Sequence, residues 1–463
     1  MDKCVISPPE ATELHCGNCR TDLPYSQETW SAIHQLLSRD WFARLWIMQE
    51  IQLAEDAILY CGRDHVHWTH FRSALLCLWN KQEIPAFFPR ERLALVERLA
   101  SPIHLSAPIS NTFTCADSRR CKDPRDLIYG FVGLLPPSFR ARIRPQYGLP
   151  VGRGYMETVL AHIQHVQRLA LLRSCYLDRR VVVNTPTWVP DFSSPKVVAR
   201  QAAWQFAAGF SSCWAEFCAP DVLKVAGVRC ATVRSLSPPI PSDKVNVESA
   251  IPARLRTIRD LEPEDLLTAP PYVMGEPFKV AYAKTLIGNY LHERFPLQTL
   301  PDLETWVAQE SANVMFGELA RSTDAGRDLI YVILGCDSPM LLRPLPNGST
   351  VVGECFVYGL NDGIALLGPF PEHWRVQNLN DFTGQFGTYS FFNAQTGALS
   401  DEDPSLGPLR GWERMSVVRT GDDPATFQCF RNNITGDVIK SDPRVSPEGL
   451  AARGVEVATF SLV

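Results

Sequence analysis

The stretch from Ser38 to Leu53 (SRDWFARLWIMQEIQL) constrains the fold of this chain more than any other. Ser38 is suited to cap a helix, and Asp40 then lies in the first turn, where the positive end of the helix dipole favours an acid. Beyond this cap, apolar side chains at helical spacing cover roughly two-thirds of the circumference. They are Trp41, Phe42, Leu45, Trp46 and Met48. The sequence therefore predicts a helix over Ser38–Leu53 that is buried on most sides.

Glu50 is the acidic residue of this stretch that raises a functional question. It follows Trp46 by one helical turn, at the edge of the apolar surface, where partial desolvation can prepare a carboxyl group for catalysis. The alternative is a structural role, in which Glu50 forms an ion pair with Arg44 or Arg63 at the rim of the core.

The composition is that of an ordinary globular chain of 463 residues, 45% hydrophobic and 21% charged. This length is typical of two to four domains. No apolar run reaches the roughly 18 residues that cross a bilayer, and the first residues lack the apolar core of a signal peptide. We therefore expect a cytoplasmic protein without a membrane partner, whose 14 cysteines are reduced thiols.

The net charge of −5 is divided unevenly along the chain. Residues 1–200 hold 24 Lys and Arg against 19 Asp and Glu, a net +5, and the remaining residues hold 21 against 31, a net −10. The basic side chains include Arg119, Arg120, Lys122, Arg125, Arg140, Arg142, Arg144 and Arg153. They could contact phosphate or nucleic acid, but no nucleic-acid motif accompanies them. We prefer contact between the halves or simple solvation, and expect no nucleic-acid partner.

Residues 1–29 are polar and lack periodicity, which predicts a loose terminal segment. They contain His15-Cys-Gly-Asn-Cys19, and a single C-x-x-C supplies two of the four ligands that a structural zinc needs. Further ligands could come from His34 or from the group His65, His67 and His70, but none has the spacing of a zinc finger. We therefore expect no metal site.

Periodicity predicts several elements in the first half of the chain. They are a buried strand at Ala57–Cys61 with a hairpin partner at Asp64–Trp68, and helices at Thr69–Asn80, Glu91–Ala100, Asp123–Leu135 and Tyr155–Leu172. In the third helix Asp123 is the predicted cap and Pro124 the first helical residue. Two prolines exclude a helix from Thr185–Ser193, so we expect an extended strap with Trp188 in a hydrophobic pocket.

The second half changes in character and predicts more strands. We expect a strand pair at Val222–Val233, helices between Ile251 and Arg294 and at Glu304–Ala320, and strands at Asp328–Leu334, Met340–Arg343 and Val351–Leu360. The three last strands predict a small antiparallel sheet or barrel that anchors or recognises rather than catalyses.

Four segments resemble, in order, the motifs of the fungal heterokaryon incompatibility (HET) domain. They are Ser38–Leu53, CKDPRDLIYGFVGLL at Cys121–Leu135, TPTWVPDFS at Thr185–Ser193, and VVGECFVYGLNDGIAL at Val351–Leu366. The spacing of Ser38, Trp46 and Glu50 is also similar, more distantly, to a TIR-domain segment in which a Trp precedes a catalytic Glu that cleaves NAD. Only 37 residues precede Ser38, too few for the strand–helix units that stand there in a TIR fold. The resemblance therefore implies a HET domain that lacks its N-terminal part.

These patterns together predict an α+β protein with the following division. Residues 1–29 are a loose segment, 30–194 a partial, TIR-like α/β HET region with a helical extension, 195–325 a mixed region, 326–372 a small antiparallel β module, and 373–463 an irregular C-terminal region.

The HET resemblance implies a regulatory or interaction protein of fungal non-self recognition, which triggers growth arrest or programmed cell death through a protein partner or self-association. One alternative is an NAD-hydrolysing enzyme, in which Glu50 stabilises the oxocarbenium-like centre and Trp46 shapes the pocket. NAD would then be a substrate, and no cofactor is expected. Another alternative is an accessory protein of a fungal biosynthetic pathway. We lean against an enzyme.

Overall fold

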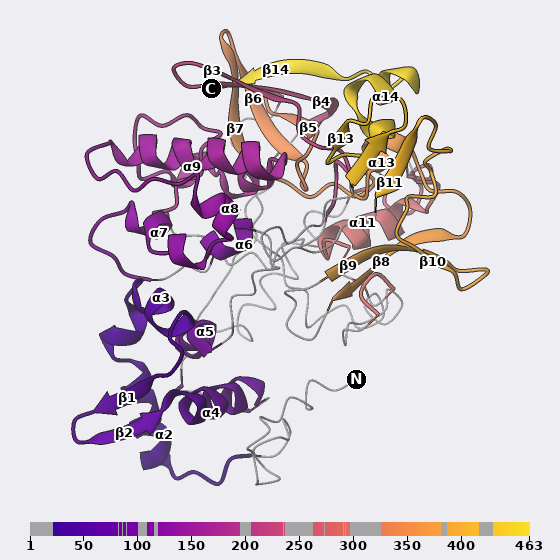
Figure 1. The fold of residues 1–463 in the computed structure, drawn as a ribbon. Helices are drawn as coiled ribbons and strands as arrows, with labels where there is room; N and C mark the ends of the chain where they lie inside the picture. The colour runs from indigo at the N-terminus through magenta and orange to yellow at the C-terminus, as the bar shows by residue number, and fades with distance from the viewer. Residues whose placement is uncertain are drawn as a thin grey trace. The chain divides into compact units, whose positions relative to one another are not determined.

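The structure is a computed structural model of the whole chain, which divides into two compact units. Unit 1 comprises Met1–Thr158 and Arg419–Ala425, and unit 2 comprises Val159–Val418 and Thr426–Val463. The residues described are 22–81, 83–85, 87–88, 90–100, 109–114, 119–194, 205–234, 236, 263–272, 274–289, 291, 293–296, 326–380, 387–415 and 429–463. The predicted boundary after residue 194 falls inside unit 2. Figure 1 colours the chain from indigo at the N-terminus to yellow at the C-terminus.

Unit 1 is mainly helical in its described residues and carries one β-hairpin. Its helices are α2 (Gln27–Leu37), α3 (Ile47–Gln52), α4 (Trp68–Asn80), α5 (Arg90–Ala100), α6 (Ile109–Thr114), α7 (Asp126–Tyr129), α8 (Pro137–Arg140) and the start of α9 (Val151–Val166). The hairpin consists of β1 (Ile58–Cys61) and β2 (Asp64–His67). The predicted hairpin and the predicted helices that became α4 and α5 are confirmed. β1, however, is not buried, since Ile58 and Tyr60 are exposed.

The single helix predicted over Ser38–Leu53 is wrong. Ser26 caps the preceding helix α2 by accepting a hydrogen bond from the Thr29 backbone N–H at 3.2 Å, and Ser38 is the C-cap of that helix. A 3₁₀ turn at Asp40–Ala43 follows, then an extended Arg44, and α3 begins only at Ile47. The break has a tertiary cause, because the backbone around Arg44 pairs with Arg120 instead of continuing the helix.

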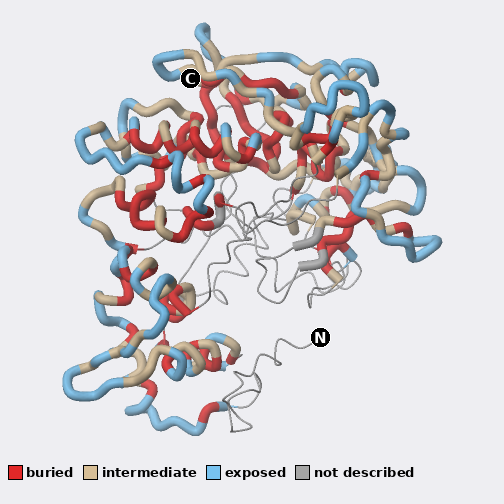
Figure 2. The backbone as a smooth tube through the Cα atoms, viewed as in Figure 1, coloured by how far each residue is buried: buried red, intermediate tan, exposed pale blue. Residues whose placement is uncertain are grey.

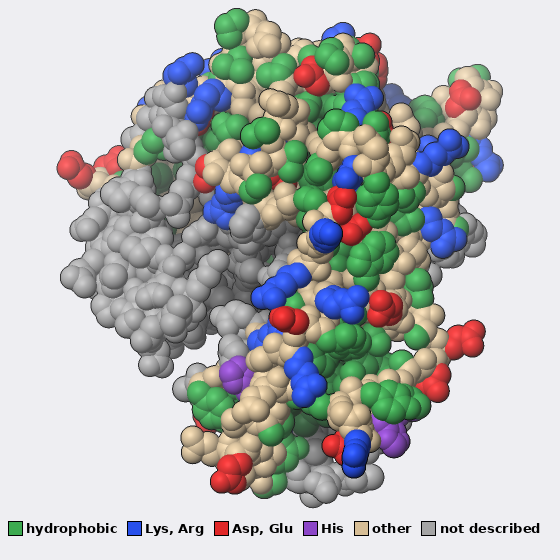
Figure 3. Space-filling view, turned by 90° about the vertical axis from the view of Figure 1, so that its left-hand side faces the viewer, with side chains coloured by type: hydrophobic (Ala, Val, Ile, Leu, Met, Phe, Trp, Pro, Cys, Tyr) green, Lys and Arg blue, Asp and Glu red, His purple; other side chains and the backbone are tan. Residues whose placement is uncertain are grey.

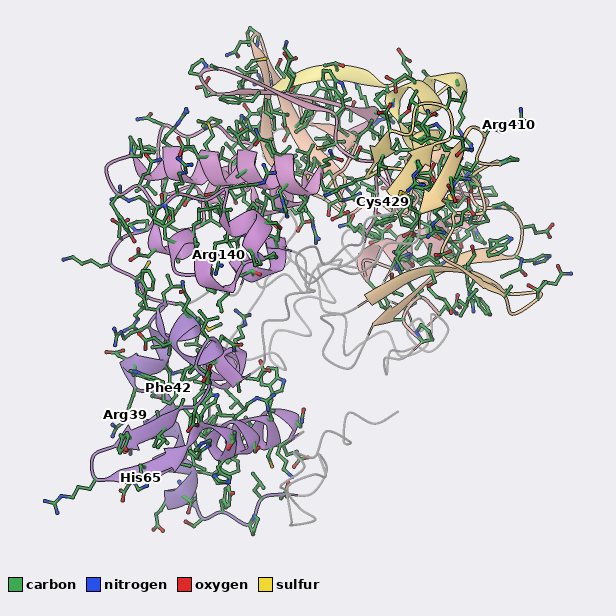
Figure 4. The ribbon with its side chains drawn as sticks, in the orientation of Figure 1. Arg39, Phe42, His65, Arg140, Arg410 and Cys429 are labelled. Atoms are coloured by element: carbon green, nitrogen blue, oxygen red, sulfur yellow. The ribbon has the colours of Figure 1, made fainter. Side chains whose placement is uncertain are left out.

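The predicted burial of this segment is only partly right. Phe42, Leu45 and Met48 are almost fully buried, whereas 38% of Trp46 is exposed. Phe42 stacks on Phe71 of α4 with ring centroids 5.7 Å apart. Figure 4 labels Phe42 on the 3₁₀ turn between α2 and α3.

The helix predicted over Asp123–Leu135 is broken into short pieces. α7 ends at Tyr129, and a separate 3₁₀ turn covers Val132–Leu134. Asp123 is not the cap that was predicted, because Arg125 is the N-cap and α7 begins at Asp126; the Oδ1 of Asp123 instead accepts from the backbone N–H of Arg125 at 2.9 Å. The predicted stop at Pro136 and Pro137 is therefore not what ends α7, and Pro137 is instead the first residue of α8.

Unit 2 contains a closed five-stranded barrel (Figure 1). Its strands are β4 (Val222–Thr232), β5 (Leu329–Ile333), β6 (Met340–Leu345), β7 (Gly348–Glu354) and β14 (Ala458–Leu462), and β3 (Ala215–Cys218) extends the sheet beside β4. Neighbours run antiparallel except β7 and β14, which are parallel, and β14 pairs with β4 to close the ring. The predicted sheet or barrel is therefore present, but it is mixed rather than antiparallel.

The strand pair predicted for Val222–Val233 is wrong, because this segment forms the single strand β4 of 11 residues. It pairs with β3 and β14 over its first half and with β5 over its second half. At the crossing, a side chain on Gly227 would lie 2.6 Å from the carbonyl oxygen of Val332, so a close approach to β5 requires the glycine.

The prediction of an irregular C-terminal region is also wrong, since this region contains strands. They are β8 (Trp374–Asn380), β9 (Gly387–Asn393) and β10 (Leu399–Ser400) in one sheet, and β11 (Trp412–Met415), β12 (Cys429–Asn432) and β13 (Val438–Ile439) in another. The helix α14 (Pro447–Ala452) then leads to β14 of the barrel. Leu450 of α14 packs with Ala226 and Val332 in the buried core. In Figure 2, which is coloured by burial, most of β7 is buried, whereas most of β14 is exposed or intermediate.

The remaining predictions of helices in unit 2 have different outcomes. α9 ends at Val166, and the 3₁₀ helix Ala170–Ser174 replaces the predicted end of the helix Tyr155–Leu172. α11 (Phe278–Leu286) lies within the predicted helical region, and the short α13 (Ile364–Leu367) was not predicted. The helix predicted at Glu304–Ala320 lies outside the described residues. Among the described residues, no helix is long and apolar enough to cross a membrane.

Candidate functional site

Glu50 and Trp46, the predicted site residues, lie on or beside the six-residue helix α3 of unit 1, and both side chains are exposed. Arg44 and Arg63 are also described, yet neither forms an ion pair with Glu50. Glu50 thus has neither the desolvated surroundings that a catalytic role needs nor the arginine partner of the alternative.

The first two motif segments meet in unit 1. The backbone N–H of Leu45 donates to the carbonyl oxygen of Arg120 at 3.0 Å, and Arg120 donates back to Ala43 at 2.6 Å. One helix turn later, the amide of Gln49 donates to the carbonyl oxygen of Tyr129 at 3.3 Å. A Cβ on Gly130 would lie 2.8 Å from Leu45, so this glycine permits the close approach.

The KDPRD string of the second motif is held by an arginine clamp. The guanidinium of Arg125 donates to both carboxylate oxygens of Asp123 at 2.9 and 2.7 Å, and to the carbonyl oxygen of Leu149 at 2.6 Å. The hydrogen bond from Arg125 lowers the pKa of Asp123. Tyr147 donates to Asp126 at 2.6 Å, and burial together with this carboxylate raises the pKa of Tyr147 to about 12. Asp123, Arg125 and Asp126 of the string therefore serve internal contacts.

The last two motif segments meet in unit 2. The hydroxyl of Thr187 accepts from the backbone N–H of Val351 at 2.9 Å and donates to the carbonyl oxygen of Val463 at the end of β14. Trp188 is fully buried, as predicted, and its ring N–H donates to the carbonyl oxygen of Asp221 at 2.8 Å. The strap Thr185–Ser193 is thus fastened to the barrel.

Glu354, in the fourth motif, is buried at the centre of a second polar group. It accepts from Arg173 at 3.1 Å, from Tyr176 at 3.0 Å and from Ser338 at 2.9 Å. Burial and the neighbouring carboxylate raise the pKa of the Tyr176 hydroxyl. Each carboxylate oxygen has a donor, so this group is a satisfied structural network.

Asp362, from the same motif, lies in a buried ion pair that the sequence did not indicate. Arg294 donates to both of its carboxylate oxygens at 2.6 Å, and the hydroxyl of Tyr389 donates to one of them at 2.7 Å. The side-chain amides of Gln205 and Asn378 lie in the same interior, and no hydrogen-bond partner among the described residues reaches either. The backbone N–H of Asp362 donates to Gln205, and that of Asn378 to Arg294, which places both residues beside the pair.

No sequence signal could have identified this cluster, because its members are separated by long stretches of chain and none belongs to a short motif except Asp362. Its charges are neutralised within the cluster. Buried carboxamides without partners are uncommon in proteins, and each is a position for a water or a polar ligand.

The basic and histidine residues singled out in the sequence are mostly used within unit 1. Arg119 is buried and donates to the carbonyl oxygens of Phe42 and Leu95. His67 accepts from the Thr69 N–H at the start of α4, and its other ring nitrogen lies 2.6 Å from Asp56. Within the described residues no group of three or more His, Cys, Asp or Glu side chains could hold a metal ion. Cys16 and Cys19 lie outside the described residues.

Unit 1 also exposes several large apolar side chains. They are Trp46, Leu53, Ile58, Tyr60 and Trp79, with exposed fractions of 38, 56, 47, 68 and 39%. Figure 3 shows hydrophobic side chains gathered in the lower part of the view, which belongs to unit 1. Exposed aromatic and aliphatic groups of this kind favour contact with another protein.

Comparison with known proteins gave no match: no family model, no curated protein and no solved structure matches this chain.

Proposed function

We propose that the protein is a regulatory or interaction protein of the heterokaryon incompatibility type. In this role it takes part in fungal non-self recognition and triggers growth arrest or cell death by binding a protein partner or a second copy of itself. The observation that carries the proposal is the pairwise meeting of the four motif segments, the first with the second in unit 1 and the third with the fourth in unit 2.

The contacts of these segments favour a scaffold over a catalytic centre. The polar side-chain atoms of three motif residues, Arg125, Thr187 and Glu354, form hydrogen bonds inside the chain. A catalytic acid or base must instead reach a proton of the substrate. Glu50 is exposed on the six-residue helix α3, beside the exposed Trp46. The motifs therefore support a surface that acts by contact.

Conditional overexpression of the chain in a filamentous fungus tests the proposal, with a full-length HET protein as the positive control. We expect growth arrest from the wild type and also from Glu50→Gln, because contact does not need this carboxylate. Normal growth with confirmed accumulation of the wild-type protein would contradict the proposal. Arrest that Glu50→Gln abolishes, at equal protein level, would favour catalysis instead.

A further inference from the structure

The hairpin of unit 1 has a free outer edge on β1. β1 and β2 are joined by the two-residue loop Gly62-Arg63, since Cys61 pairs with Asp64. In such a hairpin the residues next to the loop exchange hydrogen bonds, and every second residue then faces the partner strand. The N–H of Trp68 donates to the carbonyl oxygen of Ala57 at 2.9 Å, which fits this alternation.

It follows that the N–H and C=O groups of Ile58 and Tyr60 point away from β2. No backbone hydrogen bond reaches either residue from the rest of the described chain. Both side chains are exposed, and the strand ILYC contains no charge and no proline. Proteins usually protect a strand edge with a charged residue or a proline, because an open edge is a template for pairing with another chain.

We propose that β1 pairs with β1 of a second copy of this chain, antiparallel and about a two-fold axis at Leu59. In this register Ile58 lies opposite Tyr60 of the second copy, and Tyr60 lies opposite Ile58 of that copy. These are the residues with outward backbone groups, so each pair exchanges two hydrogen bonds. Each is also a pairing of a β-branched with an aromatic side chain, which stabilises antiparallel strands.

The charges at the ends of β1 select a second copy over an unrelated strand. Glu55 precedes the strand and Arg63 follows it, and both are exposed. Neither forms an ion pair with another described residue. They lie at opposite ends of a four-residue strand, about 10 Å or more apart, so they cannot meet in one copy. Antiparallel pairing brings each Glu55 beside Arg63 of the other copy, twice per dimer.

The charges also fix the register. A shift of the two-fold axis to Tyr60 would place Asp56 opposite Asp64 of the second copy, and like charges opposite each other destabilise strand pairs. Two short strands bury little surface, so the association is at the weak end of specific interfaces and depends on concentration.

This pairing names the partner that the proposed function leaves open. As an account of signalling it rests on that function, but the pairing itself is tested on purified protein without it. Failure of the overexpression experiment would leave the dimer intact, and absence of the dimer would leave another protein partner available to the proposed function.

Sedimentation equilibrium of the full chain over a concentration series, in reducing buffer, provides the test. We expect the average mass of the wild type to rise toward that of a dimer. Glu55→Arg and Arg63→Glu should each weaken the dimer about tenfold, because each replaces two attractive ion pairs with repulsive ones. The double variant should associate like the wild type.

A mixture of the two single variants gives the sharpest result. In a mixed dimer the charges are again complementary at both ends of β1, so mixing should restore the wild-type association that each variant alone has lost. Tyr60→Pro supplies an independent variant, since it removes an outward N–H and leaves the β1–β2 bonds intact. Circular dichroism checks that each variant is folded.

Two results overturn the proposal. One is a wild type that stays monomeric throughout the concentration series. The other is a dimer that none of the charge variants, their mixture or Tyr60→Pro alters.

Discussion

The third motif offers a matched pair of substitutions, Thr187→Val and Thr185→Val. The two threonines lie in one strap, two residues apart, and both are partly buried. The hydroxyl of Thr187 links the strap to Val351 and Val463. The hydroxyl of Thr185 is buried and has no hydrogen-bond partner in the part of the chain that the structure describes. Valine has nearly the shape of threonine, so each substitution removes the hydroxyl and little else.

Thr187→Val should lower the free energy of unfolding of unit 2 by about 1 to 3 kcal/mol, because it leaves the N–H of Val351 without a partner. The carbonyl oxygen of Val463 keeps its bond from the backbone N–H of Thr187 at 3.0 Å, so the loss stays in this range. Thr185→Val should be neutral or stabilise by up to about 1 to 2 kcal/mol, since it removes an unsatisfied buried hydroxyl.

Urea unfolding followed by tryptophan fluorescence measures both differences, because Trp188 is buried in the same strap. The reasoning is refuted if the two variants lose equal stability, or if Thr185→Val is the more damaging. Either result would mean that the strap is held by shape alone and that the hydroxyl bonds of Thr187 contribute nothing.

Three further predictions concern charged groups. Asp123→Asn should destabilise the fold above about pH 4, because the bond from Arg125 favours the ionised acid. The difference in stability between the wild type and this variant should vanish as the pH falls through the lowered pKa of Asp123. Unfolding curves at several pH values measure this difference. Arg294→Met should cost about 3 to 5 kcal/mol in urea unfolding, since it leaves the buried Asp362 unpaired, and an effect below 1 kcal/mol would contradict the pairing. Purified wild-type protein and Glu50→Gln should release equal amounts of nicotinamide from NAD in a chromatographic assay. Release by the wild type that the variant lacks would support a catalytic role for Glu50.

Local sequence determined the short elements of this protein. Turn residues and alternation were enough for the β1–β2 hairpin, and apolar spacing was enough for α4 and α5. Proline excluded a helix from the strap of Thr185–Ser193. In each case the deciding interaction lies within a few residues along the chain, so the pattern alone carries it.

The tertiary structure decided what depends on distant partners. The helix expected over Ser38–Leu53 breaks because the backbone at Arg44 pairs with Arg120, a bond that no local pattern contains. β14 closes the barrel from the far end of the chain, so a tail that reads as irregular supplies a core strand. The partners of Asp362 are likewise remote in sequence. Hydrogen bonds and ion pairs between distant segments are set by packing, which leaves no period in the sequence, and for that reason only the fold could reveal them.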